Sequence, residues 1–413
     1  MDYVTMFQEI QAVMRKDYAG AQDKKDWPIH HPDLATLKQV PDDRAFLHLI
    51  QQYLGQYRDD HVFFFNDQIP HQKVGFSVRR YQDTLYVTAV NQESRLKLGT
   101  AITAIDGLAI PAVVKAHRLE LDPIPERQLF GGILQAAQTV TLNDGQILSL
   151  RHFSVQSDPG VFTYRQLQSD MGYVKMTNFA DYTAIQQFYQ QYWPQITALP
   201  KLVIDVRVNN GGDDDNFRPL LNAMYVGTVD KSKSEPDTNM QVNATPRNYR
   251  NWQSQFTPLL PKMDDSGRQM VTRITAFLKA HQADDLISFD VPGVEETTEK
   301  IHGTDLPKRI VVLSDRYCGS SGDSFVLAAK KSPKTTVIGR ETYGVWDYAN
   351  VVTQDLGHFH LAYPITRADW IDRGAGIDGV GVQPDIHLPW TPKMITEDQD
   401  LAYAEHFLNK SAL

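Results

Sequence analysis

The first seventy residues carry apolar side chains at intervals of three and four, the period of an amphipathic helix. Two such runs occur: Met6, Ile10, Val13 and Met14, then Phe46, Ile50, Leu54 and Tyr57. The segment between them contains several prolines and predicts a connecting loop. We therefore expect a helical N-terminal domain over residues 1–70.

Strand patterns replace the helical ones after residue 70. Residues 74–90 alternate between apolar and polar side chains on either side of a charged turn at residues 80–83. Further along, Asn143-Asp144-Gly145 is typical of the turn in a β-hairpin. These patterns predict a small β-domain at residues 71–120 and a connecting β-rich segment at residues 121–168.

Strands and helices alternate over residues 169–390. The strand at residues 201–208 is continuously apolar, which is typical of a strand buried on both faces. The alternation predicts right-handed βαβ crossovers. We therefore expect an α/β fold, a mixed sheet flanked by helices, with a polar insertion at about residues 229–268. A C-terminal helical tail is expected at residues 391–413.

Composition narrows the classes of function. The 413 residues suggest two or three domains, and 42% hydrophobic with 22% charged residues is typical of globular proteins. A net charge of −9 argues against a nucleic-acid partner, and the single cysteine excludes an internal disulfide and a thiolate zinc cluster. No apolar stretch approaches the roughly 18 residues of a membrane span, and the first residues lack signal-peptide features. We expect a cytoplasmic protein whose composition permits a homo-oligomer.

The most informative segment is RIVVLSDRYCGSSGDSFVLAAKK. A buried strand is expected to lead into a short loop, and a helix to begin near Ser320, where unpaired N–H groups favour negative charge. An oxyanion formed beside Ser320 could therefore be stabilised by the N–H of Ser321. The alternatives are that Ser320 and Asp323 only form a helix-capping box, and that Cys318 is the nucleophile.

A second loop, Asn209-Asn210-Gly211-Gly212, follows the apolar strand KLVIDV. Glycines after a buried strand let the backbone approach a ligand closely. Gly211 or Gly212 could supply a second N–H to the same oxyanion. The alternative is a sharp turn with no part in binding.

Four motifs resemble the tail-specific (C-terminal processing) serine peptidases. They are LVIDVRVNNGG, VVLSDRYCGSSGDSF, VIGRETYG and IDGVGVQPDI, and they occur in the order and spacing of that family. The upstream sequence VGFSVRRYQDTLYVTAV resembles the PDZ-type domain that such enzymes often carry. The resemblance covers residues 60–390 and implies a crotonase-like peptidase core, a peptide or protein substrate, and no metal or cofactor.

Matched to these motifs, Ser320 falls at the position of the family's nucleophile. The lysine-using branch has its base in a T-x-G-K segment, but here Thr342-Tyr343-Gly344 is followed by Val345. The other branch, to which the tricorn core and the interphotoreceptor retinoid-binding protein modules are similar, carries a histidine in a D-x-H segment. Asp59-Asp60-His61 matches that segment, and Asp378 matches an acid before the closing motif.

This resemblance implies that His61 takes the serine proton as general base and that Asp378 supports the charged imidazole. An unperturbed imidazole titrates near pH 6.5, so it can act as a base at neutral pH. Asp323 and Asp347 are alternatives for the acid. His61 could instead be a core histidine beside the apolar residues 62–64.

In PDZ domains an extended peptide adds to a sheet edge, and backbone N–H groups bind its terminal carboxylate. Val74, Gly75 and Phe76 occupy the place of that loop, although they could also begin a plain strand. Two other functions remain open beside the peptidase. One is a non-catalytic protein that binds peptides or hydrophobic ligands on the same scaffold, and the other is an esterase or acyl-transfer enzyme that uses the same serine.

Overall fold

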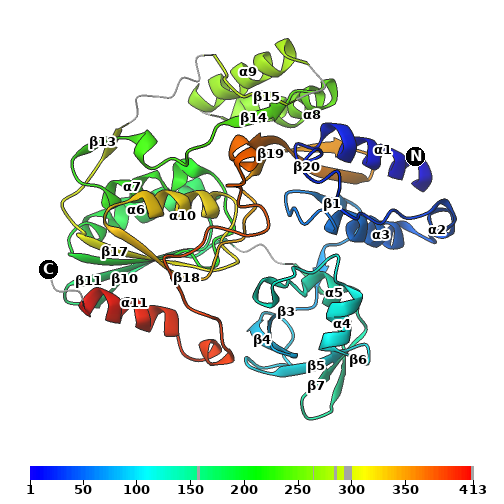
Figure 1. Cartoon of the computed structure of the whole chain (residues 1–413), viewed down its shortest axis with the longest axis horizontal. Coiled ribbons are helices and arrows are strands. Elements are labelled where there is room, and N and C mark those ends of the chain that lie inside the picture. Colours follow the sequence, from blue (N-terminus) through cyan, green and yellow to red (C-terminus); the bar gives the residue numbers. More distant parts are fainter. Residues whose placement is uncertain (156–158, 264, 283–285, 293–299, 411–413) are drawn as a thin grey trace.

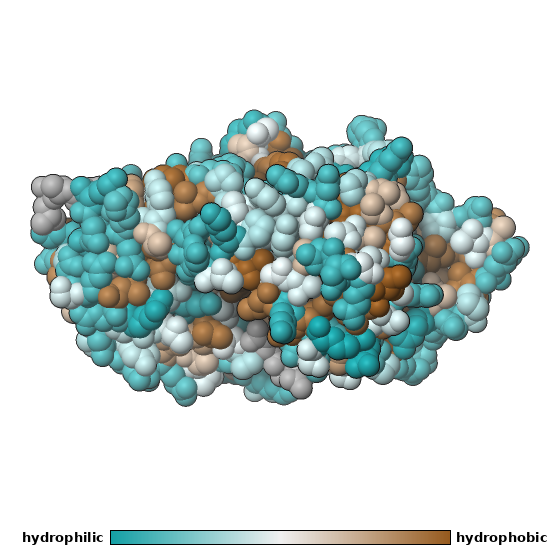
Figure 2. Space-filling view, turned by 90° about the horizontal axis from the view of Figure 1, so that it is seen from below, coloured by the Kyte–Doolittle hydropathy of each residue, from teal (hydrophilic) through white to brown (hydrophobic). Residues whose placement is uncertain are grey.

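The computed structural model describes residues 1–155, 159–263, 265–282, 286–292 and 300–410 (Figure 1). Three larger sheets, each with its own helices, form a mixed α/β architecture. Within these ranges no helix has the length and apolar character needed to span a membrane. Figure 2 shows one face, on which apolar residues reach the surface in small groups among hydrophilic ones. Most large apolar side chains are instead gathered in clusters around the sheets.

The central sheet carries the expected strand–helix alternation. Adjacent strands are parallel except at one edge, where the first two strands are antiparallel. In spatial order the strands are β10 (Phe162–Gln168), β11 (Met171–Met176), β12 (Lys201–Asp205), β17 (Arg309–Ser314), β18 (Thr335–Gly339) and β21 (Ile386–His387).

Helices cover both faces of this sheet (Figure 1). One face packs against α6 (Tyr182–Ile196), α7 (Arg218–Met224) and α10 (Ser321–Lys331), and the other against α11 (Gln399–Lys410). Burial on both faces explains the apolar run Leu202-Val203-Ile204 in the middle of β12. The predicted α/β fold with a mixed sheet flanked by helices is confirmed.

A second sheet joins the start of the chain to two later segments. Its central strand β20 (Phe359–Ala368) pairs antiparallel with β1 (Phe63–Asn66), β14 (Met240–Asn243) and β19 (Tyr348–Asp355), and β15 (Leu286–Ser288) pairs with β14. The helices on this sheet are α1 (Tyr3–Ala12), α2 (Leu34–Gln39), α3 (Asp43–Gly55), α8 (Pro246–Phe256) and α9 (Asp265–Ala280), and a π-helix spans Val13–Asp17.

One apolar cluster unites these elements. It includes Ile10 and Phe46 from the N-terminal helices, Leu278 from α9 and Tyr363 from β20. Each N-terminal helix has a single apolar face, so the helices bury it against a sheet built by later residues. The polar stretch expected as an insertion supplies β14 and α8 to the same layer.

The third sheet lies in residues 74–150. Its strands are β3 (Phe76–Tyr81), β4 (Thr84–Val90), β5 (Ala101–Ile105), β7 (Thr139–Leu142) and β8 (Ile147–Ser149), with the short β6 (Leu108–Ala109) beside β5 and helices α4 (Ile110–Ala116) and α5 (Gly131–Ala136) packed on it. The hairpin expected around Asn143-Asp144-Gly145 is confirmed. Because β7 pairs with β5, the expected boundary at residue 120 falls inside one sheet.

Two short pairs complete the strands of the described residues. The pair β2 (Gln72–Lys73) and β9 (Phe153–Ser154) lies where the chain enters and leaves the third-sheet unit. The pair β13 (Thr228–Asp230) and β16 (Lys300–His302) lies beside α7.

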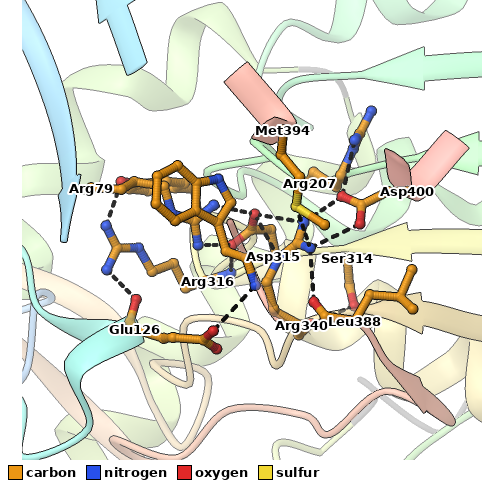
Figure 3. A network of polar contacts seen from close by, with 12 residues as sticks. Arg79, Glu126, Arg207, Ser314, Asp315, Arg316, Arg340, Leu388, Met394 and Asp400 are labelled. Carbon is orange, nitrogen blue, oxygen red and sulfur yellow. Dashed lines mark hydrogen bonds and ion pairs between the residues drawn. The ribbon is translucent and has the colours of Figure 1, made fainter. Parts of the chain in front are cut away.

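A buried network of ion pairs joins the third sheet to the central sheet (Figure 3). Arg79 of β3 contacts both carboxylate oxygens of Asp315, at 2.7 and 2.9 Å. Arg340 donates to the same carboxylate at 3.1 Å and to Asp400 of α11 at 2.8 Å. Burial alone would raise the pKa of Asp315, but Arg79 and Arg340 hold it well below its usual range. The network therefore fixes the loop that follows β17.

The third-sheet unit also contacts the loop after β18. Arg127 donates to Thr342 O at 2.9 Å, and Arg316, in the loop after β17, donates to Gln128 O at 2.8 Å. Both loops are thereby held from one side by residues 74–150. The loop after β17 leads directly into Ser320, and the loop after β18 packs against the residue before Ser320.

Candidate active site

Ser320 lies in the turn between β17 and α10 and has an unusual backbone conformation. Its φ is 58° and its ψ is −121°. An ordinary N-cap serine is extended, with negative φ, and a non-glycine residue at positive φ persists only where its surroundings impose it. A strained serine between a strand and a helix is the arrangement that exposes the nucleophile in other serine hydrolases. Ser320 therefore differs from a serine that only caps a helix.

Asp323 holds this turn in place. Its fully buried carboxylate accepts the N–H of Ser320 at 2.9 Å, of Gly344 at 2.9 Å and of Val345 at 3.0 Å. The capping box that the sequence offered as an alternative is present. The same carboxylate also fastens the neighbouring loop, so it is committed to backbone amides. Asp323 is thus suited to positioning Ser320.

Cys318, the rival nucleophile, is fully buried. Burial, together with the nearby Asp323 and Asp315 carboxylates, raises the pKa of its thiol well above the usual value. The reactive form of cysteine is the thiolate, which this environment disfavours. Cys318 packs in the apolar cluster of the central sheet.

The glycine loop after β12 lies directly against Ser320. A Cβ added to Gly211 would lie 2.6 Å from Ser320 Cβ, so only glycine allows this approach. The Gly211 N–H donates to Asn209 Oδ1 at 3.0 Å. By contrast, the N–H groups of Gly212 and Ser321 have no acceptor among the hydrogen bonds of the described residues. Ser321 directly follows Ser320, and Gly212 directly follows the glycine that contacts it.

His61 is held in one orientation by the backbone of β19. Its Nδ1 lies 2.6 Å from Tyr348 O, and its own N–H donates to Asp59 Oδ1 at 3.0 Å. A carbonyl can only accept, so the proton of the neutral ring is on Nδ1, and Nε2 keeps a lone pair. This is the tautomer that a general base needs. In the described structure no hydrogen bond joins the ring to Ser320 Oγ.

Tyr343 connects the serine and histidine segments. Its N–H donates to Cys318 O at 2.7 Å, and its Cβ lies 2.8 Å from where a Cβ on Gly319 would be. Its hydroxyl donates to Asp60 Oδ2, next to His61. The ring of Tyr343 therefore spans from the residue before Ser320 to the residue before His61.

Asp378 lies near Tyr348 and is paired with a lysine. Its Oδ2 is 2.8 Å from Lys24 Nζ, while its Oδ1 is buried without a hydrogen-bond partner. Burial raises the pKa of Asp378 to about 7, against the opposing charge of Lys24. No hydrogen bond between Asp378 and His61 occurs in the described residues, since Tyr348 O holds the imidazole N–H.

Asp347, the other alternative acid, is fully buried and accepts three hydrogen bonds. The donors are Trp370 Nε1 at 2.6 Å and the N–H groups of Ile377 at 2.6 Å and Asp378 at 2.8 Å. Asp347 therefore fixes the backbone that carries Asp378. Sequence reasoning missed Tyr343, Tyr348 and Lys24, because none of them stands out by periodicity or composition.

A cavity of about 890 Å³ runs between the third-sheet unit and the central sheet. Val74 and Phe76 of the predicted peptide-binding loop line it, together with Leu134 of α5. Gly75 lies between Val74 and Phe76 with φ 74°. Residues of the central sheet unit close the other side, among them Lys175 and Asn210. The cavity therefore extends from β3 toward the glycine loop beside Ser320.

Comparison with known proteins links this arrangement to one family. A sequence model described as "Peptidase family S41" matches residues 170–388. A putative Tricorn-like protease C-terminal subunit of Sulfurisphaera tokodaii is 20% identical over 97% of this chain and 42% of its own length. The chain thus spans less than half of that relative.

Solved structures show the same fold at low sequence identity. Mature CPAF complexed with lactacystin superposes with a TM-score of 0.64 at 14% identity, over 98% of this chain and 97% of that one. A CPAF mutant gives a TM-score of 0.66 at 13% identity, over 100% and 98%.

Proposed function

Since the chain belongs to peptidase family S41, as its motifs indicate, we propose that it is a serine-type peptidase in which Ser320 is the nucleophile and His61 the general base. The observation that carries this proposal is the strained conformation of Ser320, with φ 58°, together with the N–H groups of Ser321 and Gly212, which have no acceptor among the described residues. A capping serine has no use for either feature. A serine that must present Oγ to a carbonyl and stabilise the resulting oxyanion needs both.

The proposed reaction uses these groups in order. Ser320 Oγ attacks the peptide carbonyl carbon while His61 Nε2 takes the hydroxyl proton, and the N–H groups of Ser321 and Gly212 bind the oxyanion. The imidazolium then gives its proton to the leaving amine, and water hydrolyses the acyl-enzyme by the same route. Catalytic hydrogen bonds in a resting enzyme are often long and tighten when substrate binds, which fits the open Ser320–His61 pair.

In this proposal one residue orients His61 and another stabilises its charged form. Tyr348 O orients the imidazole through Nδ1, at 2.6 Å. Asp378, ionised and near Tyr348, stabilises the imidazolium through its charge. Gly211 allows the glycine loop to approach Ser320 closely, and Gly212 supplies the N–H that binds the oxyanion.

Residues 74–150 are proposed to act as a PDZ-like peptide-binding unit. Strand β3 is at the edge of its sheet, and a cavity lies along it. Val74 and Phe76 line that cavity, and Gly75 O accepts the N–H of Asn91 at 2.9 Å, which fixes the loop. A substrate chain held there in extended form would lead toward Asn210 and the serine. Peptide or protein substrates and a cytoplasmic location remain predictions.

The test is covalent labelling with a fluorophosphonate, read by intact mass and peptide mapping. Wild type should gain one adduct on Ser320, whereas Ser320→Ala should gain none and His61→Ala should react at least about a thousandfold more slowly. Ser94→Ala, at an exposed site of the third-sheet unit, is the matched control. Unlabelled but folded wild type would favour the binding-only alternative. Equal turnover of Ser320→Ala on a peptide substrate would overturn the assignment.

A further inference from the structure

A buried lysine lies close to the proposed site, in the turn that follows the π-helix. The side chain of Lys24 is 1% exposed, and its Nζ is 2.8 Å from Asp378 Oδ2. The same ammonium donates to Tyr57 O at 2.9 Å. A buried ammonium is costly unless it is paired and hydrogen-bonded, so its place here needs an explanation.

Lys24 contacts the residue that orients the imidazole. Its Nζ lies 4.9 Å from the centre of the Tyr348 ring, and Tyr348 O accepts from His61 Nδ1 at 2.6 Å. Its other partner, Tyr57, ends the segment that leads into Asp59-Asp60-His61. Lys24 therefore makes three separate contacts: an ion pair with Asp378, a hydrogen bond to Tyr57 O and a cation–π contact with the ring of Tyr348.

We propose that Lys24 is a positioning residue that keeps Asp378 ionised, and that it thereby sets the pH range in which His61 can accept the proton of Ser320. The proposal rests on the proposed function and extends it. Lys24 does not touch the substrate or the reacting atoms; it acts through Asp378 and Tyr348.

The groups facing Asp378 show why a cation is needed. From the N-terminal segments come Lys24, Tyr18 and Asp59. Asp347 comes from the loop before β19, and Tyr348 is the first residue of β19. Lys24 is the only cation of these groups within the described residues. Burial and the charges of Asp59 and Asp347 all favour the protonated form of Asp378, and Lys24 opposes them.

Asp59, whose carboxylate acts on Asp378, accepts two hydrogen bonds. Asp59 accepts Tyr18 Oη at 2.7 Å and the N–H of His61 at 3.0 Å. Removing the ammonium of Lys24 would therefore leave Asp378 facing two carboxylates in a largely buried place. Its pKa would rise further, and Asp378 would hold a proton at neutral pH.

The predicted consequence is a shift in the pH profile. In the proposed mechanism activity needs the ionised form of Asp378, so the rising limb of kcat/KM cannot lie below the pKa of that carboxyl. In Lys24→Met that limb should move to higher pH by about one to three units, the range that an opposite charge produces at this distance. Lys24→Arg keeps the charge and should keep the limb near its wild-type position.

The experiment compares fluorophosphonate inactivation rates and kcat/KM from pH 5 to 10 for wild type, Lys24→Met, Lys24→Arg and Lys25→Met. Lys25 is the exposed neighbour of Lys24 and serves as the matched control. Circular dichroism and thermal melting report whether each variant is folded. A purely structural ion pair would change the melting temperature and the overall rate but leave the position of the limb unchanged.

If Lys24→Met does not fold, a double variant in which both partners of the ion pair are neutral still tests the proposal. The double variant Lys24→Met/Asp378→Asn leaves no unpaired buried charge. It should lose activity and lose the limb that belongs to Asp378, and Lys24→Met should add little in the Asp378→Asn background. Wild-type kcat/KM in the double variant would overturn the inference.

Other outcomes separate the two proposals. A wild-type enzyme that reacts at no pH would refute the proposed function itself. A reactive wild type with an unshifted Lys24→Met profile would refute only the role of Lys24. Loss of all reactivity in Lys24→Met up to pH 10, with activity retained in His61→Ala, would make Lys24 the base and overturn both.

Discussion

His61 Nδ1 lies 2.6 Å from the carbonyl oxygen of Tyr348, so a backbone group and not a carboxylate orients the imidazole. A carbonyl fixes the tautomer, but it carries no full charge to balance an imidazolium. In the proposed mechanism that charge comes from Asp378, which lies near Tyr348. Orientation and charge compensation, which one aspartate supplies in a Ser-His-Asp triad, are here divided between two residues.

The pH dependence of wild type follows from this division. Burial raises the pKa of Asp378 to about 7, and the active form is the ionised one. Activity should therefore fall as the pH drops through about 7 and the carboxylate takes up a proton. Rates of fluorophosphonate inactivation between pH 5 and 9 measure this, and Asp378→Asn should lack the corresponding limb. A flat wild-type profile over that range would contradict the role of Asp378.

Gly211→Ala should nearly abolish activity. Its Cβ would lie 2.6 Å from Ser320 Cβ, and the residue has φ 89°, so the loop would have to move away from the nucleophile. We expect kcat to fall at least about a hundredfold, since the oxyanion donor of Gly212 moves with the loop. Gly227→Ala is the control, because Gly227 has φ 66° but no atom near its absent Cβ. Equal losses in both variants would mean that backbone strain alone is responsible.

Tyr343→Phe should lower kcat by roughly tenfold with a smaller change in KM, because Asp60 loses its hydrogen bond next to His61. Steady-state kinetics on a peptide substrate measure the effect. Tyr182→Phe removes a hydroxyl at a side chain that is 65% exposed and should behave as wild type. Unchanged kcat in Tyr343→Phe would show that this bridge does not position the base.

Arg79→Met should destabilise the protein by about 3 kcal/mol at neutral pH, because it leaves the buried Asp315 with less compensation. Arg79 and Arg340 lower the pKa of Asp315, so their stabilisation is complete above the unfolded-state pKa and is lost as the pH falls. The stability difference between wild type and Arg79→Met should thus shrink below about pH 4. Denaturant titrations at pH 7 and pH 3.5 measure both values. An unchanged difference would assign the effect to packing.

Much of the fold could be predicted from sequence because its signals are local. The apolar strand that became β12 and the hairpin at residues 139–149 were recognised from periodicity and turn residues. The association of α1 and α3 with β14, α9 and β20 could not be, since nothing in an amphipathic helix states which distant sheet will cover its apolar face.

In the candidate site, too, some residues could be predicted from the sequence and others could not. Ser320 and His61 could be proposed from motifs, since each lies in a segment with a recognisable pattern. The partner of the imidazole could not, because Tyr348 acts through its backbone carbonyl, which is independent of residue type. Lys24 lies in an irregular turn, and its burial depends on the pairing of segments far apart in the chain.

The pairing of β1 with β20 has a consequence for biosynthesis. His61 precedes β1, and its support comes from β19, while β1 is placed by Phe63 opposite Ala362 and its neighbours. In the proposed mechanism the histidine reaches the serine only when β20 has emerged from the ribosome and the start of the chain has packed onto it. The proposed mechanism therefore implies that a nascent chain that has just been extended past Ser320 lacks a supported base, and that it stays inactive until β19 and β20 have been made and paired.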